Sequence, residues 1–218
     1  MKVIVIYILI FFSFINISHA ENDTSSEKSW YSKGLSEEKR ASNINNRLEL
    51  LGEKITEKES IALTDKVNDH YNKALSFYLK GAEEGSAISA WKAASLGSSG
   101  MAEQLSAEKI KTLTLQAARG NVVDAQMSFV FDNCNAQYTE CKDDKLAVFW
   151  IKKAIKNKSD IAANILGFLY EYGRLVDKNI NMAISCYKLS SEFGNNEAKK
   201  NMIRLLNNKI YSQNNICE

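Results

Sequence analysis

A pattern that returns about every 36 residues constrains the fold of this chain more than any other feature. Four segments align on one key position, with spacings of 35, 38 and 36 residues: Ala74, Lys109, Ala147 and Ala183. Small and apolar side chains follow it at i+3, i+4 and i+7, the stripe of an amphipathic helix. Eleven residues after the key position the four segments have, in order, Gly85, Gly120, Lys158 and Gly194. Glycine readily adopts the left-handed conformation that closes a helix, so we expect these positions to end four helices.

A second helix precedes each of these segments. The clearest one ends at Gly173 and has its apolar residues at helical spacing: Ala162, Ile165, Leu166, Leu169 and Tyr170. Two such helices and two tight turns account for the period, which is typical of a solenoid whose hairpins bury their apolar faces against their neighbours. We therefore expect an all-α, right-handed α/α solenoid of about nine or ten helices. Trp150 and Tyr187 should be buried between paired helices.

The most specific motif lies between residues 160 and 198. An LGxxYxxG helix is followed by a turn and a KAxxxYxxAAxxGxxxA helix, with matches at Leu166-Gly167, Tyr170, Gly173, Val176-Asp177-Lys178, Ala183, Tyr187, Gly194 and Ala198. This pattern resembles the Sel1-like repeat, a relative of the tetratricopeptide repeat. The other repeats are degenerate, and the one over 121–158 has Phe131 at the glycine position and Cys134 at the tyrosine position. The resemblance covers about residues 70 to 208.

The ends of the chain differ from the repeats. Lys2, an apolar stretch over 3–15 and small residues up to Ala20 are typical of a cleaved signal peptide, with an uncleaved anchor as the alternative. We therefore expect a periplasmic or secreted protein. The expected organisation is a signal peptide over 1–20, an N-terminal leader and capping helix over 21–65, a repeat solenoid over 66–208 and a C-terminal tail over 209–218. Within the second segment, residues 21–36 are expected to form a loose leader.

All four cysteines lie after the predicted cleavage site, and an even number in an exported chain favours two disulfides. Cys134 and Cys141 fall on the two sides of one inter-helix turn. The last helix should run antiparallel to the helix of Cys186, which brings the tail with Cys217 back within its reach. We predict the pairs Cys134–Cys141 and Cys186–Cys217. No cysteine has the CxxC spacing of a zinc site, so we expect no bound metal.

Composition argues against several classes of function. Lys plus Arg is 28 against 26 for Asp plus Glu, and a net charge of +2 gives no electrostatic case for nucleic acid. His70 is the only histidine after Ala20, so histidine catalysis has little material, and we expect a surface or capping role for it. We predict a protein that is not an enzyme, binds no cofactor and does not insert stably into a membrane. Aromatic residues on the repeat stripes are expected in the core: Trp91, Phe129, Phe131 and Trp150.

Solenoids of paired helices bind proteins on an extended surface, typically the one lined by the first helix of each pair. Here the first helices are expected over 87–97, 122–134 and 160–172. We expect their exposed residues to contact a partner: Ser89, Lys92, Asp124, Ser128, Asp132, Asn164, Glu171, Tyr172 and the adjoining Arg174. Tyr172 and Arg174 rank highest, because interface hot spots favour aromatic and arginine side chains.

The resemblance implies scaffold or adaptor work, with another protein as the partner. Some exported members of the family are immunity proteins that neutralise phospholipase-type effectors of type VI secretion, so a toxic effector is the most specific partner hypothesis. Two alternatives stay open. One is a cysteine-containing relative with weak β-lactamase or penicillin-binding activity, and the other is an envelope scaffold.

Overall fold

The computed structural model describes residues 25–207 and Cys217. The predicted signal peptide therefore lies outside the described residues. The described chain is helical, with one isolated β-bridge between Cys134 and Cys141. Its elements are α1 (Ser25–Leu51), η1 (Gly52–Lys54), α2 (Glu57–Glu83), α3 (Ala87–Ser98), α4 (Ala107–Arg119), α5 (Val123–Asn133), α6 (Asp144–Lys156), α7 (Asp160–Tyr172), α8 (Ile180–Glu192) and α9 (Asn196–Asn207). The predicted all-α fold is confirmed.

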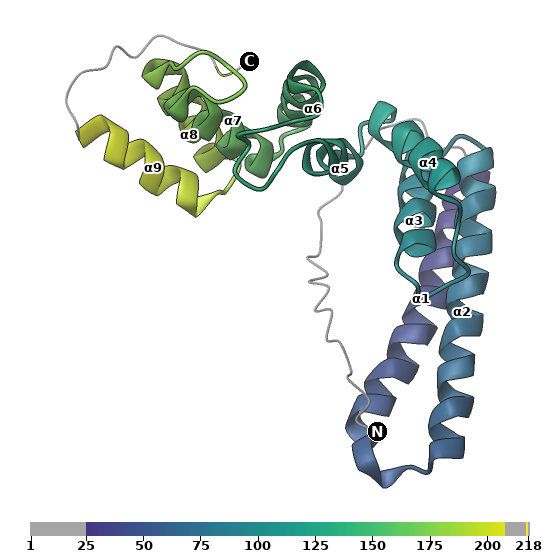
Figure 1. The fold of residues 1–218 in the computed structure, drawn as a ribbon. Helices are drawn as coiled ribbons and strands as arrows, with labels where there is room; N and C mark the ends of the chain where they lie inside the picture. Colours follow the sequence, from purple (N-terminus) through teal and green to yellow (C-terminus); the bar gives the residue numbers. More distant parts are fainter. Residues whose placement is uncertain (1–24, 208–216, 218) are drawn as a thin grey trace.

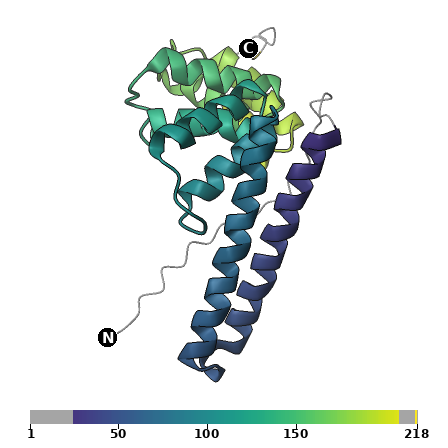
Figure 2. The same cartoon turned by 90° about the vertical axis from the view of Figure 1, so that its right-hand side faces the viewer.

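The helices pack as successive antiparallel hairpins (Figure 1). The pairs α1–α2, α3–α4, α5–α6 and α7–α8 each contact the next pair, and α9 ends the series against α8. Helices α1 and α2 have 27 residues each, whereas the later ones have 11 to 13. The long pair projects from the rest as an arm, which Figure 2 shows most clearly.

The arm corrects one expectation from the sequence. Residues 25–36 do not form a loose leader, because α1 begins at Ser25. Gly34 lets α1 approach α2 closely, because a Cβ built on it would lie 2.3 Å from the ring of Tyr78 on α2. His70, expected as a surface or capping residue, instead joins the two helices: its Nδ1 lies 2.6 Å from a carboxylate oxygen of the buried Glu37. The many serine and lysine residues of this stretch favoured a loose segment. They are compatible with a helix, because only the narrow side of α1 that packs on α2 needs to be apolar.

The same turn connects each hairpin to the next. In all four turns, the backbone N–H of the residue that precedes the new helix bonds to a carbonyl five residues earlier: Ser86 to Gly81, Val122 to Ala117, Ser159 to Ala154 and Asn195 to Ser190. The residue before the donor has positive φ in each case: 102° at Gly85, 69° at Asn121, 61° at Lys158 and 106° at Gly194. This geometry is the Schellman motif, which satisfies carbonyls left free at a helix end. The same turn therefore marks the start of each new hairpin and of the final helix.

The second repeat lies one residue later than the sequence alignment placed it. Gly120 has a φ of −81°, and its neighbour Asn121 takes the left-handed position. The key position of this repeat is correspondingly filled by the half-buried Ile110, while Lys109 is exposed. Gly120 is required for a different reason. A Cβ built on it would lie 2.2 Å from the Cβ of Ala87 on α3, so the two helices of this hairpin meet there without room for a side chain.

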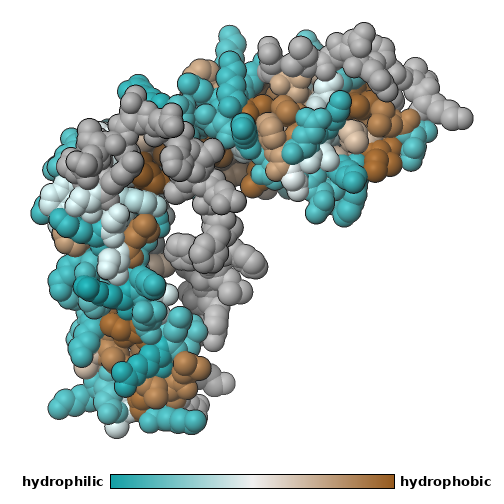
Figure 3. Space-filling model, turned by 180° about the vertical axis from the view of Figure 1, so that it is seen from behind, coloured by the Kyte–Doolittle hydropathy of each residue, from teal (hydrophilic) through white to brown (hydrophobic). Residues whose placement is uncertain are grey.

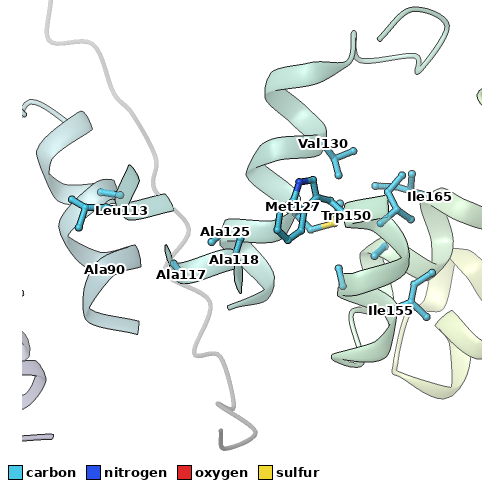
Figure 4. Close-up of a cluster of buried hydrophobic side chains, with 14 of the residues drawn as sticks. Ala90, Leu113, Ala117, Ala118, Ala125, Met127, Val130, Trp150, Ile155 and Ile165 are labelled. Carbon is cyan, nitrogen blue, oxygen red and sulfur yellow. The ribbon is translucent and has the colours of Figure 1, made fainter. Parts of the chain in front are cut away.

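Small and apolar side chains from successive hairpins form the core (Figure 4). Trp150, 5% exposed, stacks on the half-buried Phe129 with ring centroids 5.3 Å apart. Tyr187 is 1% exposed and packs against Gly167, whose missing side chain leaves room for the ring. Both burial predictions are confirmed. Phe131, also expected in the core, is 53% exposed, because Val130 one residue earlier fills the buried position.

Candidate protein-binding face

Helices α5 and α7 are successive first helices, and each exposes one stripe. Side chains three or four residues apart lie on the same side of a helix. The side that reaches the surface carries exposed or half-buried residues: Asp124, Ser128, Phe131 and Asp132 on α5 and Ile161, Asn164, Phe168 and Tyr172 on α7. These eight residues are termed the α5–α7 face. Three of its large apolar residues, Phe131, Ile161 and Tyr172, are about half exposed, at 52% to 53%.

Aromatic rings gather where α7 ends. The ring centroids of Phe168 and Tyr172 are 4.8 Å apart, and the edge of Tyr138 approaches Phe168 at 6.4 Å. The guanidinium carbon of Arg174 lies 4.9 Å from the Phe168 centroid and 5.6 Å from that of Tyr172. A cation held over ring faces at this distance is attracted by the ring quadrupole, whose faces are electron-rich. Arg174 therefore holds the rings together and leaves Tyr172 facing solvent.

The loop between α5 and α6 is fastened beside these rings. The Cys134–Cys141 disulfide closes it, and the backbone carbonyl of Gln137 accepts a hydrogen bond from Arg174. At its base, the side-chain amide of Asn133 pairs with the backbone of Asp143 in both directions. The loop is thus tied both to its own ends and to α7. The second predicted disulfide, Cys186–Cys217, is also present.

A buried carboxylate joins the last three helices behind this face. Glu171 on α7 accepts a hydrogen bond of 2.8 Å from the Tyr187 hydroxyl on α8, and the Arg204 guanidinium on α9 lies 2.8 Å from the same carboxylate. Burial raises the pKa of Glu171, but the hydrogen bonds from Arg204 and Tyr187 outweigh it, so the pKa lies below its usual value of 4.5. Burial, followed by the bond to Glu171, raises the pKa of the Tyr187 hydroxyl. The carboxylate therefore stays charged and the phenol stays protonated near neutral pH.

Comparison with known proteins identifies the architecture. No protein-family model matches the chain, and no curated protein matches its sequence. Among solved structures, a Sel1 repeat protein from Oxalobacter formigenes superimposes with a TM-score of 0.52 at 24% identity, over 60% of this chain and 97% of that one. A protective antigen with an SLR fold, present in uropathogenic Escherichia coli strains, superimposes with a TM-score of 0.55 at 14% identity, over 88% of this chain and 46% of that one. The chain has the Sel1-like repeat fold.

Most of the predicted contact residues reach the surface of the Sel1-like repeats. Seven of the nine are exposed or half-exposed: Lys92, Asp124, Ser128, Asp132, Asn164, Tyr172 and Arg174. Asn164 keeps its Oδ1 enclosed and without a hydrogen-bond partner among the described residues. Lys92 belongs to the inter-helix contacts near the arm, since its Nζ lies 2.9 Å from a carboxylate oxygen of Glu38 on α1.

Two of the predicted contact residues are not exposed. Ser89 is fully buried because α3 packs it against α2, where a Cβ on Gly81 would lie 2.5 Å from its Oγ. Glu171 is buried because Tyr187 and Arg204 enclose it. The exposure predicted for these two residues was wrong. Both lie on first helices, but on the sides that face the neighbouring helices.

Several residues on or beside the α5–α7 face were not among the predicted contact residues. Phe131, Ile161 and Phe168 lie on the α5–α7 face, and Tyr138 borders it. One signal was present in the sequence, because Phe168 follows Ile161 by seven residues on the α7 stripe. Hydrophobic residues gather visibly over the part built by α7 to α9 and near the free end of the arm (Figure 3).

The described residues offer few other sites. No group of three or more His, Cys, Asp or Glu side chains among them is placed to hold a metal ion. Within the same residues, each helix is too short or too polar to cross a bilayer.

Proposed function

We propose that this protein is an exported, non-enzymatic scaffold that binds another protein through its α5–α7 face. One observation carries the proposal: Phe131, Ile161 and Tyr172 are about half exposed on successive first helices of a packed solenoid. Exposed apolar residues in one area mark interaction sites, and tyrosine and arginine are frequent interface hot spots. Two disulfides support a location in an oxidising compartment, such as the periplasm or the cell exterior.

The surroundings of the face support the same proposal. Arg174 and the closed loop hold Phe168 and Tyr172 in place before any partner arrives. A preorganised surface loses less conformational entropy on binding, so more of the contact energy appears as affinity. The face therefore suits a partner that docks as a folded protein or as an extended segment of one.

Site-specific photo-crosslinking tests this proposal. A benzophenone amino acid replaces Tyr172 in the full chain, produced in its native host, and a matched variant carries the same group at the exposed Lys188 on α8. We expect a discrete protein adduct, identified by mass spectrometry, from position 172 but not from position 188. Equal adducts at both positions, or none at position 172, would show that this face is not the binding surface.

N-terminal sequencing of the mature protein tests export. We expect the mature chain to begin at Glu21.

The narrower hypothesis is an immunity protein that neutralises a phospholipase-type effector of type VI secretion. An immunity protein needs a specific binding face and no catalytic centre. The second and third repeats diverge from the family pattern, and such divergent residues can give specificity for one partner. The test is a survival assay with a phospholipase encoded beside this gene and directed to the periplasm of a sensitive strain. Co-expression of the chain should restore growth, and the Tyr172→Ala, Phe131→Ala double variant should not. Failure of the wild-type chain to protect would reject the immunity role.

A further inference from the structure

The charges on the α5–α7 face do not balance. Asp124 and Asp132 lie two turns apart on α5, both exposed, and neither carboxylate forms an ion pair with a described residue. Lys142 lies beside Asp132, but its Nζ donates to the backbone carbonyl of that residue, at 3.1 Å. Asp124 is exposed as a residue, but the protein around its carboxyl partly desolvates it, and this raises the pKa of that carboxyl.

The cations beside the face are already engaged. Arg174 lies over the rings of Phe168 and Tyr172 and donates to the Gln137 carbonyl. Arg204 is held by the buried Glu171. Moving either arginine to Asp124 or Asp132 would break these contacts. The face therefore presents two carboxylates on α5 that form no ion pair with a described residue, beside an apolar surface.

The apolar part of the face lies next to these carboxylates. Phe131 directly precedes Asp132, and it stands on the same side of α5 as Asp124. Phe168 and Tyr172 supply further rings on α7. A lysine or arginine has both an apolar stem and a charged head, so it can cover ring surface while its head reaches a carboxylate.

We propose that the segment of the partner bound here is basic and apolar: one or two Lys or Arg side chains that pair with Asp124 and Asp132, beside an aromatic or aliphatic side chain that packs on Phe131. This inference rests on the proposed function and specifies its partner. Charge complementarity of this kind steers association and selects among partners, and it weakens as salt screens the exposed charges. An acidic segment would be repelled by the same two carboxylates.

The test uses random 12-residue peptides displayed on phage, selected against the disulfide-bonded chain from residue 21. Enriched peptides are then synthesised and their affinities measured by calorimetry at low and high salt. The critical variant is Asp124→Asn with Asp132→Asn. The matched control, Asp65→Asn with Glu192→Gln, makes the same change of net charge at exposed positions on α2 and α8. Thermal melts establish that both variants are folded.

We expect enriched peptides with Lys or Arg beside an aromatic or aliphatic residue. Their Kd should rise about tenfold in the Asp124, Asp132 variant and stay unchanged in the control, and high salt should weaken binding to the wild-type chain. Enriched peptides that are acidic or neutral, or that bind the critical variant as well as the wild type, would overturn this inference and leave peptide binding intact. If no peptide is enriched, the inference fails together with peptide binding by this face.

Discussion

The phenol of Tyr187 and the guanidinium of Arg204 meet at one carboxylate oxygen, because each donates a hydrogen bond of 2.8 Å to Oε2 of Glu171. The three residues come from α8, α9 and α7 in turn. A solenoid gains stability only from contacts between neighbouring units, so its last helix is the one most prone to separate. The carboxylate of Glu171 fastens that helix to the two before it.

This contact makes stability depend on pH. Because the pKa of Glu171 is lower in the folded chain than its usual value of 4.5, its contribution is complete above that value and is lost as the pH falls through the folded pKa. We expect the difference in Tm between wild type and Glu171→Gln to be large at pH 7 and to shrink towards pH 3. The control is Glu197→Gln, which removes an exposed carboxylate from α9. A Tm difference that is the same at both pH values would contradict this assignment.

The phenol can be tested separately. Tyr187→Phe removes only the hydroxyl that donates to Glu171, so the ring against Gly167 stays in place. A hydrogen bond to a charged acceptor contributes about 1.5–3 kcal/mol. We expect a loss near the lower end of that range in urea unfolding, because Arg204 still compensates the carboxylate. An unchanged midpoint would mean that the hydroxyl contributes nothing.

Two aromatic residues on adjacent helices should differ sharply in importance. Trp150 is 5% exposed and stacked on Phe129, so Trp150→Ala should cost about 3–5 kcal/mol. Phe131→Ala removes a ring that is 53% exposed and should change stability by no more than about 0.5 kcal/mol. Chemical unfolding of the two variants measures both values. Similar losses would place Phe131 in the core and remove it from the binding face.

Two substitutions at the turns should act in opposite directions. Lys158 has a φ of 61°, a conformation that costs a residue with a Cβ roughly 1–2 kcal/mol. Lys158→Gly should therefore stabilise the chain by up to about 1 kcal/mol. Gly120→Ala should destabilise it by about 1–3 kcal/mol, because its Cβ would collide with Ala87. A stabilising Gly120→Ala would show that α3 and the end of α4 are not in contact there.

The two disulfides should contribute unequally. They join residues 7 and 31 positions apart, and in the chain-entropy model closed loops of these sizes stabilise by about 2.5 and about 3.5 kcal/mol. Replacing both cysteines of one pair by serine, one pair at a time, measures each contribution in urea unfolding. Peptide mapping without reductant checks the pairing, and a Cys134 peptide linked to Cys186 or Cys217 would contradict it.

The sequence predicted the solenoid and the cysteine pairing, because both depend on local patterns that recur. Helical stripes and the 36-residue period fix which segments pair, and pairing brings Cys134 towards Cys141 and Cys186 towards Cys217. The register of the second repeat failed for a physical reason. Glycine is the usual residue at a left-handed helix end, but asparagine also tolerates it, and Asn121 takes the position that Gly120 was expected to hold.

The candidate face was only partly predictable. Helical spacing identifies the two sides of a first helix, but not which neighbour each side meets. Ser89 is buried because Gly81 on the preceding hairpin lets α2 approach α3. Nothing in the sequence of α3 itself indicates this contact. The network around Glu171 joins positions 16 and 33 residues apart. Local patterns cannot reveal such a contact before the hairpins are stacked.

The hairpin arrangement of the arm allows its length to vary without affecting the rest of the fold. At 1.5 Å per residue, α1 and α2 are each about 40 Å long, roughly twice the length of the helices that follow. The chain runs out along α1, turns at Gly52–Lys54 and returns along α2, so it enters and leaves the arm at the same end. Matched insertions or deletions of about two turns in both helices would change the reach of the arm and leave every other hairpin where it is. The length of the arm can therefore change without moving the hairpins that carry the α5–α7 face.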